Sequence, residues 1–189
     1  MSYKKTNIIG DPQVGEKEIN DYLQNLGDNE FCTLCLIDVD DLRLINAQYG
    51  YESGNRILSR FLDALSTVAK EEDVIVKFGS DEFILFIKDT SIKDTNKRIH
   101  GLYSKLKVLS KEFEVAVGCS VGLAGTDAAD NYLELFQYAD KTLENIKKYG
   151  KNNMAWYVDM PTKMEENFDE IETVKLIYDK YIELLPPNA

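Results

Sequence analysis

The segment VIVKFGSDEFILFI, residues 74–87, decides the fold of this chain. It contains two apolar runs, Val74–Phe78 and Glu82–Ile87, separated by Gly79-Ser80-Asp81. Two strand-like runs with a short glycine-containing connector predict a β-hairpin. The predicted tip therefore presents the carboxyl groups of Asp81 and Glu82.

A second acidic group follows an earlier predicted strand. The apolar run from Phe31 to Asp38 is nearly continuous, as expected for a central strand covered on both faces, and Asp38-Val39-Asp40-Asp41 ends it. Ligand sites in α/β sheets gather at strand ends, and carboxylates concentrated there repel one another. Either cluster alone is more commonly solvated surface charge. Together they favour Mg²⁺, which binds one or two carboxylates plus substrate phosphates.

The remaining patterns alternate helix and strand. They predict an α/β sandwich with a central, mostly antiparallel five-stranded sheet and helices on both faces. Residues 1–15 are expected to form an irregular lead-in, and residues 16–160 one domain. Besides the hairpin and the strand 31–38, the predicted elements are helices 16–26, 42–70 (interrupted by Gly50 and Gly54), 92–109 and 132–148, and strands 113–123 and 154–158.

The C-terminal segment, residues 161–189, is predicted to be separate from the domain. Pro161 breaks the chain, and Glu165 to Leu185 has apolar residues stepping by three and four, typical of an amphipathic helix. This helix either caps its own domain or serves as a dimerisation or connector helix that contacts a partner domain.

Composition narrows the classes of partner. The 189 residues are 44% apolar and carry a formal charge of −11, which argues against nucleic acid or an anionic membrane as partner. A nucleotide remains compatible because divalent cations bridge carboxylates and phosphates. There is no membrane-length apolar run and no signal-peptide pattern, and Cys32, Cys35 and Cys119 are expected to be buried thiols in a reducing cytoplasm.

Five segments, in the family's order along the chain, resemble one known family over roughly residues 16–158. Phe78-Gly79-Ser80-Asp81-Glu82-Phe83 is similar to the signature hairpin of GGDEF domains, with serine in place of the second glycine. The segment from Asp38 to Arg43, with Asn46 and Gly50 after it, resembles the family's other signature, D-x-D-x-F-K-x-x-N-D-x-x-G-H. The matching later segments are Ser120-Val121-Gly122, Ala139-Asp140, and Lys147 with Gly150-Lys151-Asn152.

The resemblance implies a diguanylate cyclase with a nucleotidyl-cyclase-like, palm-like fold. Such an enzyme condenses two GTP molecules, one on each subunit of an antiparallel homodimer, into cyclic di-GMP and pyrophosphate. Each 3′-hydroxyl attacks the α-phosphate of the opposing nucleotide. Two Mg²⁺ (or Mn²⁺) ions per active site polarise the phosphates and lower the pKa of the hydroxyl.

By the same resemblance, Asp38 supplies a carboxylate to the metal and Val39 its main-chain carbonyl. Asp81 and Glu82 share the remaining metal-ligand and catalytic base roles. Gly79 lets the hairpin backbone approach the phosphates, with Ser80 beside it. The β- and γ-phosphates are expected to meet Lys147 and Lys151 with help from Arg43, whereas Asn46 and the residue at position 55 face the guanine.

Several positions depart from the family pattern. Ser80 would cost about 1–2 kcal/mol if its position requires positive φ. Asn55 replaces an aspartate that accepts hydrogen bonds from guanine, which opens the choice between GTP and ATP. The product-inhibition motif R-x-x-D survives as a remnant, Lys70 and Asp73, and lysine lacks the bidentate fork of arginine.

Three functions therefore remain open. The first is a diguanylate cyclase, weak or relaxed in its choice of base. The second is a catalytically silent GGDEF domain that binds GTP or a cyclic dinucleotide and regulates a neighbouring domain. The third is an interaction domain that works through its C-terminal helix.

Overall fold

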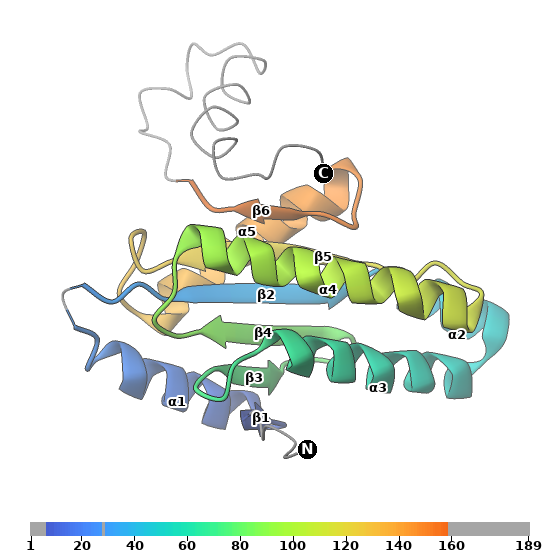
Figure 1. Ribbon diagram of the computed structural model, residues 1–189, viewed down its shortest axis with the longest axis horizontal. Coiled ribbons are helices and arrows are strands. Elements are labelled where there is room, and N and C mark those ends of the chain that lie inside the picture. Colours follow the sequence, from blue (N-terminus) through green and yellow to red (C-terminus); the bar gives the residue numbers. More distant parts are fainter. Residues whose placement is uncertain (1–6, 28, 159–189) are drawn as a thin grey trace, which may run out of the picture.

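The computed structural model describes residues 7–27 and 29–158, which form one six-stranded sheet (Figure 1). The order across the sheet is β1-β3-β4-β2-β5-β6. The two edge pairs, β1·β3 and β5·β6, are parallel, and the three central pairs are antiparallel. The strands are β1 (Asn7–Ile9), β2 (Thr33–Val39), β3 (Val74–Lys77), β4 (Glu82–Ile87), β5 (Cys119–Gly125) and β6 (Met154–Trp156).

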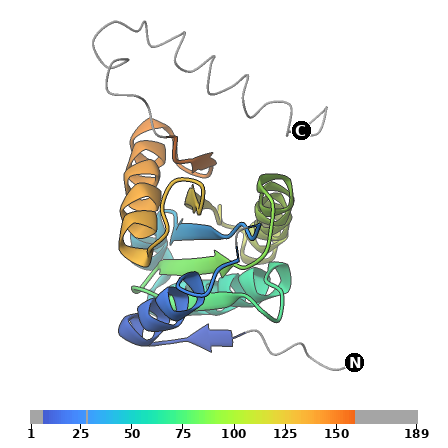
Figure 2. The same ribbon diagram turned by 90° about the vertical axis from the view of Figure 1, so that its left-hand side faces the viewer.

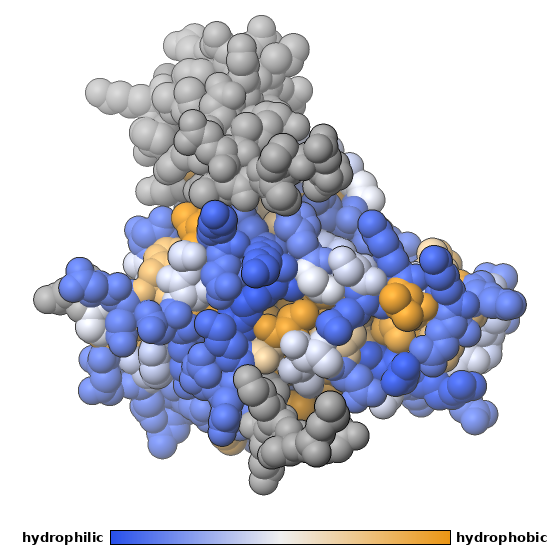
Figure 3. Space-filling view, viewed as in Figure 1, coloured by the Kyte–Doolittle hydropathy of each residue, from blue (hydrophilic) through white to orange (hydrophobic). Residues whose placement is uncertain are grey.

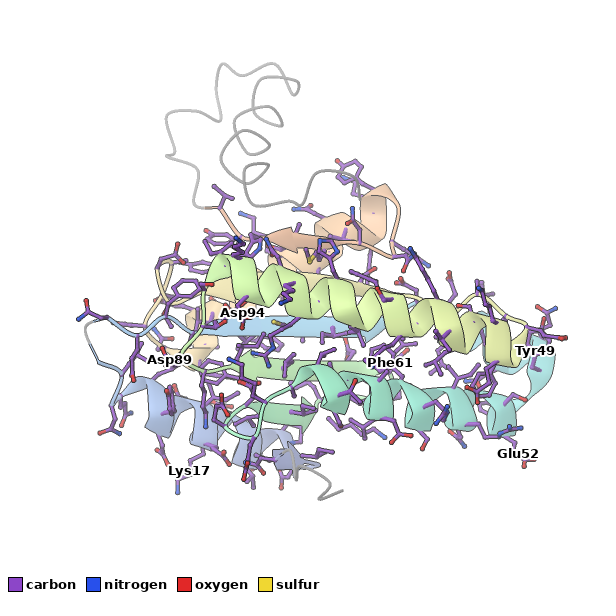
Figure 4. All side chains as sticks on the ribbon, in the orientation of Figure 1. Lys17, Tyr49, Glu52, Phe61, Asp89 and Asp94 are labelled. Carbon is purple, nitrogen blue, oxygen red and sulfur yellow. The ribbon has the colours of Figure 1, made fainter. Side chains whose placement is uncertain are left out.

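Helices cover both faces of this sheet (Figure 2). On one face lie α3 (Tyr51–Val68) and α4 (Ile92–Phe113), and on the other lie α1 (Pro12–Leu23) and α5 (Tyr132–Tyr149). The short α2 (Leu42–Tyr49) follows β2 directly. Phe61 of α3 points into the first layer (Figure 4). The predicted α/β sandwich is thus confirmed, with six strands instead of five.

Strand β2 shows why its sequence is apolar almost throughout. Successive side chains of a strand point to opposite faces, so Cys35 and Ile37 enter the α3–α4 layer while Cys32 and Leu36 enter the α1–α5 layer. Both thiols are fully buried, as predicted, and burial raises the pKa of the Cys35 thiol. A C-x-x-C split between two layers cannot act as a redox or zinc pair.

The chain before residue 16 is more regular than predicted, and it supplies the sixth strand. Ile9 of β1 is buried beside β3. Helix α1 begins at Pro12, which suits a first helical position because it needs no N–H donor there, and Asp11 caps the helix through Gln13 N–H at 2.9 Å. Gly15 brings α1 against β3, since a Cβ there would lie 2.5 Å from a methyl group of Val76.

The interruption predicted at Gly50 is confirmed, whereas Gly54 lies inside α3. Gly50 has a φ of 84°, which suits glycine, and it turns the chain between α2 and α3. Tyr49 and Glu52 mark this corner at one end of the molecule (Figure 4). Helix α4 runs on to Phe113, and the strand predicted at 113–123 begins only at Cys119, because Phe113 and Val115 pack against the core from the helix end and loop.

The surface is mainly hydrophilic on the face shown in Figure 3, in keeping with 29% charged residues. None of the described helices is long and apolar enough to cross a membrane. The predicted C-terminal helix, 165–185, lies outside the described residues.

Candidate functional site

The two acidic segments meet at one end of the central strands. In the antiparallel register of β2 and β4, Asp38 is paired with Glu82. The ladder continues by one bond beyond this pair, as the backbone N–H of Val39 donates to the carbonyl oxygen of Asp81 at 3.0 Å. Sheet pairing therefore brings together the three acids that the sequence analysis singled out, Asp38, Asp81 and Glu82.

This end of the sheet is an unfavourable place for negative charge. Burial raises the pKa of the Asp38 carboxyl, and the charges of Asp81 and Asp40 add to the rise. The pKa of Glu82 is also raised, first by burial and then by the charge of Asp38. Lys147 opposes both effects. Each carboxyl would be stabilised in its ionised form by a further cation nearby.

The hairpin tip is tight but not strained at the predicted position. The N–H groups of Phe78 and Gly79 both donate to the carbonyl oxygen of Glu82, at 3.0 and 3.1 Å. A Cβ on Gly79 would lie 2.7 Å from a carboxylate oxygen of Glu82, so glycine makes room for that side chain. Ser80 does not have positive φ, and the strain considered for it is absent. Its hydroxyl instead donates to Asp81 Oδ1 at 2.6 Å.

Helix α5, which lies close to β5, carries Lys147, and the turn that follows the helix carries Lys151. A Cβ on Gly122 would meet the carbonyl oxygen of Ala139 at 2.0 Å, which accounts for two of the matched family segments together. Lys147 Nζ lies 2.7 Å from Asp38 Oδ2, and Lys151 Nζ lies 2.6 Å from Asp41 Oδ1. The hydrogen bond to Asp41 raises the pKa of Lys151. Both predicted phosphate-binding lysines are thus paired with the acidic segment 38–41.

The predicted base-reading residues lie on α2 and α3. Asn46 Oδ1 is buried with no hydrogen-bond partner and faces Gly54, where a Cβ would lie only 1.8 Å away. Asn55, one residue further along α3, is exposed, as is Arg43 on α2. Within the described residues, neither of these two side chains makes a hydrogen bond or an ion pair. The structure does not bring them into contact with the acidic cluster.

The predicted inhibitory remnant is different in kind. The Asp73 side chain is completely buried and forms an ion pair with Arg98. It also accepts hydrogen bonds from the backbone N–H groups of Lys70, at 2.6 Å, and Lys88, at 3.1 Å. Its carboxylate is therefore already engaged inside the fold, and the role of Lys70 and Asp73 as a remnant of an inhibitory site stays a prediction. The Lys70 ammonium reaches Asp94, at the other end of the molecule from Tyr49 (Figure 4).

Sequence reasoning missed three residues beside the site. Asp40 is buried and accepts hydrogen bonds from Ser120 Oγ and the backbone N–H of Asn152, both at 2.8 Å. All three stand within the matched segments, and that placement was the only available signal. Arg98, the partner of Asp73, was also missed, although a charge among the apolar positions of a helix face could have suggested a buried ion pair.

The donor set fits a divalent ion that arrives with a nucleotide. Among the described residues, no three His, Cys, Asp or Glu side chains form a ready cage for a metal ion. Mg²⁺ does not need one, since it is usually held by one or two carboxylates and completed by phosphate oxygens and water. Asp38, which is mostly buried and ionises reluctantly beside other acids, is a suitable carboxylate ligand.

Comparison with known proteins assigns the family. The family model described as "Diguanylate cyclase, GGDEF domain" matches residues 13–153. The chain belongs to the GGDEF domain family. Among curated proteins, it is similar to diguanylate cyclase DosC of Escherichia coli K12, with 29% identity over 127 residues. That match covers 65% of this chain and 27% of DosC. A match to diguanylate cyclase DgcS of Shewanella oneidensis, 27% identical over 120 residues, covers 64% of this chain and 40% of DgcS.

Solved GGDEF domains share the fold. The GGDEF domain of YfiN (TpbB) from Pseudomonas aeruginosa superposes with a TM-score of 0.72 at 16% identity, covering 84% of this chain and all of that one. Diguanylate cyclase SiaD, solved with its activator SiaC from the same organism, gives a TM-score of 0.66 at 22% identity, covering 78% of this chain and 61% of that one. Of the curated relatives named above, the chain matches 27% of the length of DosC and 40% of the length of DgcS, less than half of either protein.

Proposed function

We propose that this GGDEF domain is a diguanylate cyclase that condenses two GTP molecules into cyclic di-GMP and two pyrophosphates. It would act as a homodimer, with two Mg²⁺ or Mn²⁺ ions in each active site. The observation that carries the proposal is the meeting of Asp38, Asp81 and Glu82 at one sheet end, with Lys147 2.7 Å from Asp38. Carboxylates for a metal and a cation for a phosphate thus stand side by side.

In this proposal the residues of the site divide three tasks: metal binding, phosphate binding and proton transfer. Asp38, the Val39 carbonyl and the hairpin acids hold the divalent ions, which supply Lewis-acid polarisation of the phosphates. Lys147 leaves Asp38 and contacts the phosphate oxygens when the nucleotide arrives, and Lys151 does the same from Asp41. Glu82, paired with Asp38 across the strands, is also the group proposed to accept the proton of the attacking 3′-hydroxyl.

Base choice is the open part of this function. The amide of Asn55 offers one acceptor and one donor group, so it satisfies guanine only in part and can also pair with adenine. Asn46 approaches the same α2–α3 corner with a buried, unpartnered Oδ1. We therefore expect GTP to be preferred over ATP by less than a carboxylate at position 55 would allow, and Asn55→Asp to sharpen the preference.

The test is product analysis with GTP, with ATP and with both. Concentrated protein and Mg²⁺ are incubated with each nucleotide, and cyclic dinucleotide and pyrophosphate are quantified by chromatography and mass spectrometry. Glu82→Gln should abolish product, whereas Asp63→Asn, at an exposed position of α3, should leave it unchanged. Absence of any cyclic dinucleotide from protein shown to dimerise would refute the cyclase function.

A second candidate is nucleotide binding without turnover. It is favoured by the Ser80 hydroxyl, which donates to Asp81 Oδ1 and so competes for a carboxylate that the chemistry requires. Here GTP or a cyclic dinucleotide would act as a regulatory ligand for a partner domain. Binding of Mg·GTP by calorimetry, with no product from the dimer, would select this function. Ser80→Gly would then be expected to restore some turnover.

A further inference from the structure

Asp40 lies at the centre of a hydrogen-bond network that joins three segments distant in sequence. Its side chain is 6% exposed, and both carboxylate oxygens are used. Oδ1 accepts from Ser120 Oγ on β5, and Oδ2 accepts from the N–H of Asn152 in the turn between α5 and β6, each at 2.8 Å. Its own N–H donates to the carbonyl oxygen of Gly118 at 3.0 Å. Each oxygen of this carboxylate is thus engaged by a contact inside the fold.

The turn that Asp40 holds has an unfavourable backbone conformation. Gly150, Lys151 and Asn152 have φ values of 151°, 58° and 46°. Such left-handed geometry is unfavourable for lysine, and it persists only where neighbouring groups enforce it. The carbonyl oxygen of Ile146 accepts from the N–H groups of Gly150 and Lys151, at 3.1 and 3.0 Å. Beyond Lys151, the bond from Asn152 N–H to Asp40 is the next anchor.

The exposed ion pair at this turn is too weak to fix it. Lys151 and Asp41 meet at 2.6 Å, but both side chains are more than two-fifths exposed, and such pairs contribute little. A charge-assisted bond to a buried carboxylate is stronger. Asn152 adds a second contact within this network. Its side chain packs against Gly118, where a Cβ would lie only 2.7 Å from Asn152 Oδ1.

We infer that Asp40 is a positioning residue, which acts through the Asn152 N–H to hold the strained turn and aim Lys151 at the phosphates. The inference rests on the proposed function for the role of Lys151. It gives Asp40, Ser120 and Asn152 a shared task that none of them performs by touching the nucleotide or the metal.

A hydrogen-bonding role and a charge role predict different results for two variants of Asp40. In Asp40→Asn, the amide oxygen can accept from Asn152 N–H, while the amide nitrogen donates to Ser120 Oγ, which can act as an acceptor. Both hydrogen bonds of the network are then preserved without the negative charge. Asp40→Ala removes both bonds. If Asp40 instead bound a metal or acted by charge, the asparagine variant would fail as the alanine variant does.

The first measurement needs no ligand. Amide hydrogen exchange at Asn152 should become at least about tenfold faster in Asp40→Ala, since the bond is lost, and change much less in Asp40→Asn, where the bond persists without its charge. Ser120→Ala is the matched control, because it removes the bond to the other oxygen and leaves the Asn152 bond in place. Unchanged exchange in a folded Asp40→Ala would overturn the inference.

The second measurement is Mg·GTP affinity by calorimetry. Asp40→Ala and Lys151→Ala should each weaken binding by about tenfold, and the double variant should be no weaker than either single variant. Asp40→Asn should bind almost as wild type. Losses that multiply in the double variant, or an asparagine variant as weak as the alanine variant, would overturn the inference.

Two further outcomes are also decisive. If Asp40→Ala does not fold, Asp40→Asn decides alone: exchange and affinity near those of the wild type support the inference, and loss of both overturns it. If the wild type does not bind Mg·GTP but Asn152 exchange responds as expected, the proposed function fails while Asp40 remains the anchor of the turn.

Discussion

Replacing Gly122 with alanine tests the closest helix–sheet approach in the domain. Gly122 is buried in the middle of β5, and a Cβ there would lie 2.0 Å from the carbonyl oxygen of Ala139 and 2.8 Å from the backbone nitrogen of Leu143. Both atoms belong to the backbone of α5, so no side-chain rotation can relieve the contact. The helix must move away from the sheet, or β5 must bend.

The size of the effect follows from that displacement. Contacts under 3.0 Å are not tolerated by a Cβ, so α5 must retreat by about 1 Å. Leu135, Ala139 and Leu143 are buried on its inner face, and a gap of that width forfeits roughly a quarter to a half of each close contact. We expect a loss of about 3 kcal/mol in unfolding free energy, at the upper end of ordinary overpacking, and a Tm lower by about 6–12 °C.

Urea and thermal denaturation measure this loss, and Gly101→Ala is the matched control. Gly101 lies inside α4, where a Cβ would meet only a methyl group of Val68 at 3.6 Å, so alanine should stabilise the protein by about 0.5–1 kcal/mol through helix propensity. A Gly122→Ala protein within about 1 kcal/mol of the wild type would refute the reasoning, since α5 would then have room that the structure denies it.

Three further predictions concern charges. Arg98→Met leaves the buried Asp73 carboxylate without its cation and should cost about 3–5 kcal/mol in urea denaturation. Arg60→Met, which breaks an exposed pair, should cost far less, and similar losses would contradict the burial argument. Asp38→Asn should stabilise the protein at neutral pH, because folding raises the pKa of this acid and its ionised form therefore opposes folding. The gain should fade as pH falls through the raised folded-state pKa and be absent below the unfolded carboxyl pKa of about 4. Lys147→Met should act in the opposite direction at neutral pH, because it removes the cation that lowers the pKa of Asp38; stability curves from pH 3 to 8 check both signs.

The sequence predicted the layers of this domain well, because its periodicities are strong. The run from Phe31 to Asp38, the hairpin and the stripe of α3 each have one strong pattern. The prediction of helix and strand boundaries failed where a rule about one residue type was applied without regard to the residue's surroundings. Pro12 and Gly15 resembled chain breakers, yet one begins α1 and the other lets α1 approach Val76. Such a contact between α1 and β3 cannot be read from either segment alone.

The acidic residues of the candidate site were predicted from the sequence, but the buried contacts around them were not. Asp38 and Glu82 stand out because each ends a recognisable strand, and their pairing follows from antiparallel register. The position of Arg98 among apolar residues of α4 indicates a buried charge, but its pairing with Asp73 could not be foreseen, since the two residues are separated by the whole hairpin and the start of α4. The strain considered for Ser80 depended on a backbone angle that the sequence does not determine.

The residues that match the family pattern therefore fall into two groups: those that make contacts inside the fold and those expected to face the nucleotide. Gly122 with Ala139, and Asp40 with Ser120 and Asn152, satisfy contacts inside the fold. Any sequence that keeps these internal contacts will match the family whether or not it turns over a nucleotide. Departures at Ser80 and Asn55 fall on exposed positions, where no packing contact opposes a change. Membership of the family thus follows mainly from internal packing, and the cyclase activity has to be decided by the few residues that face the nucleotide.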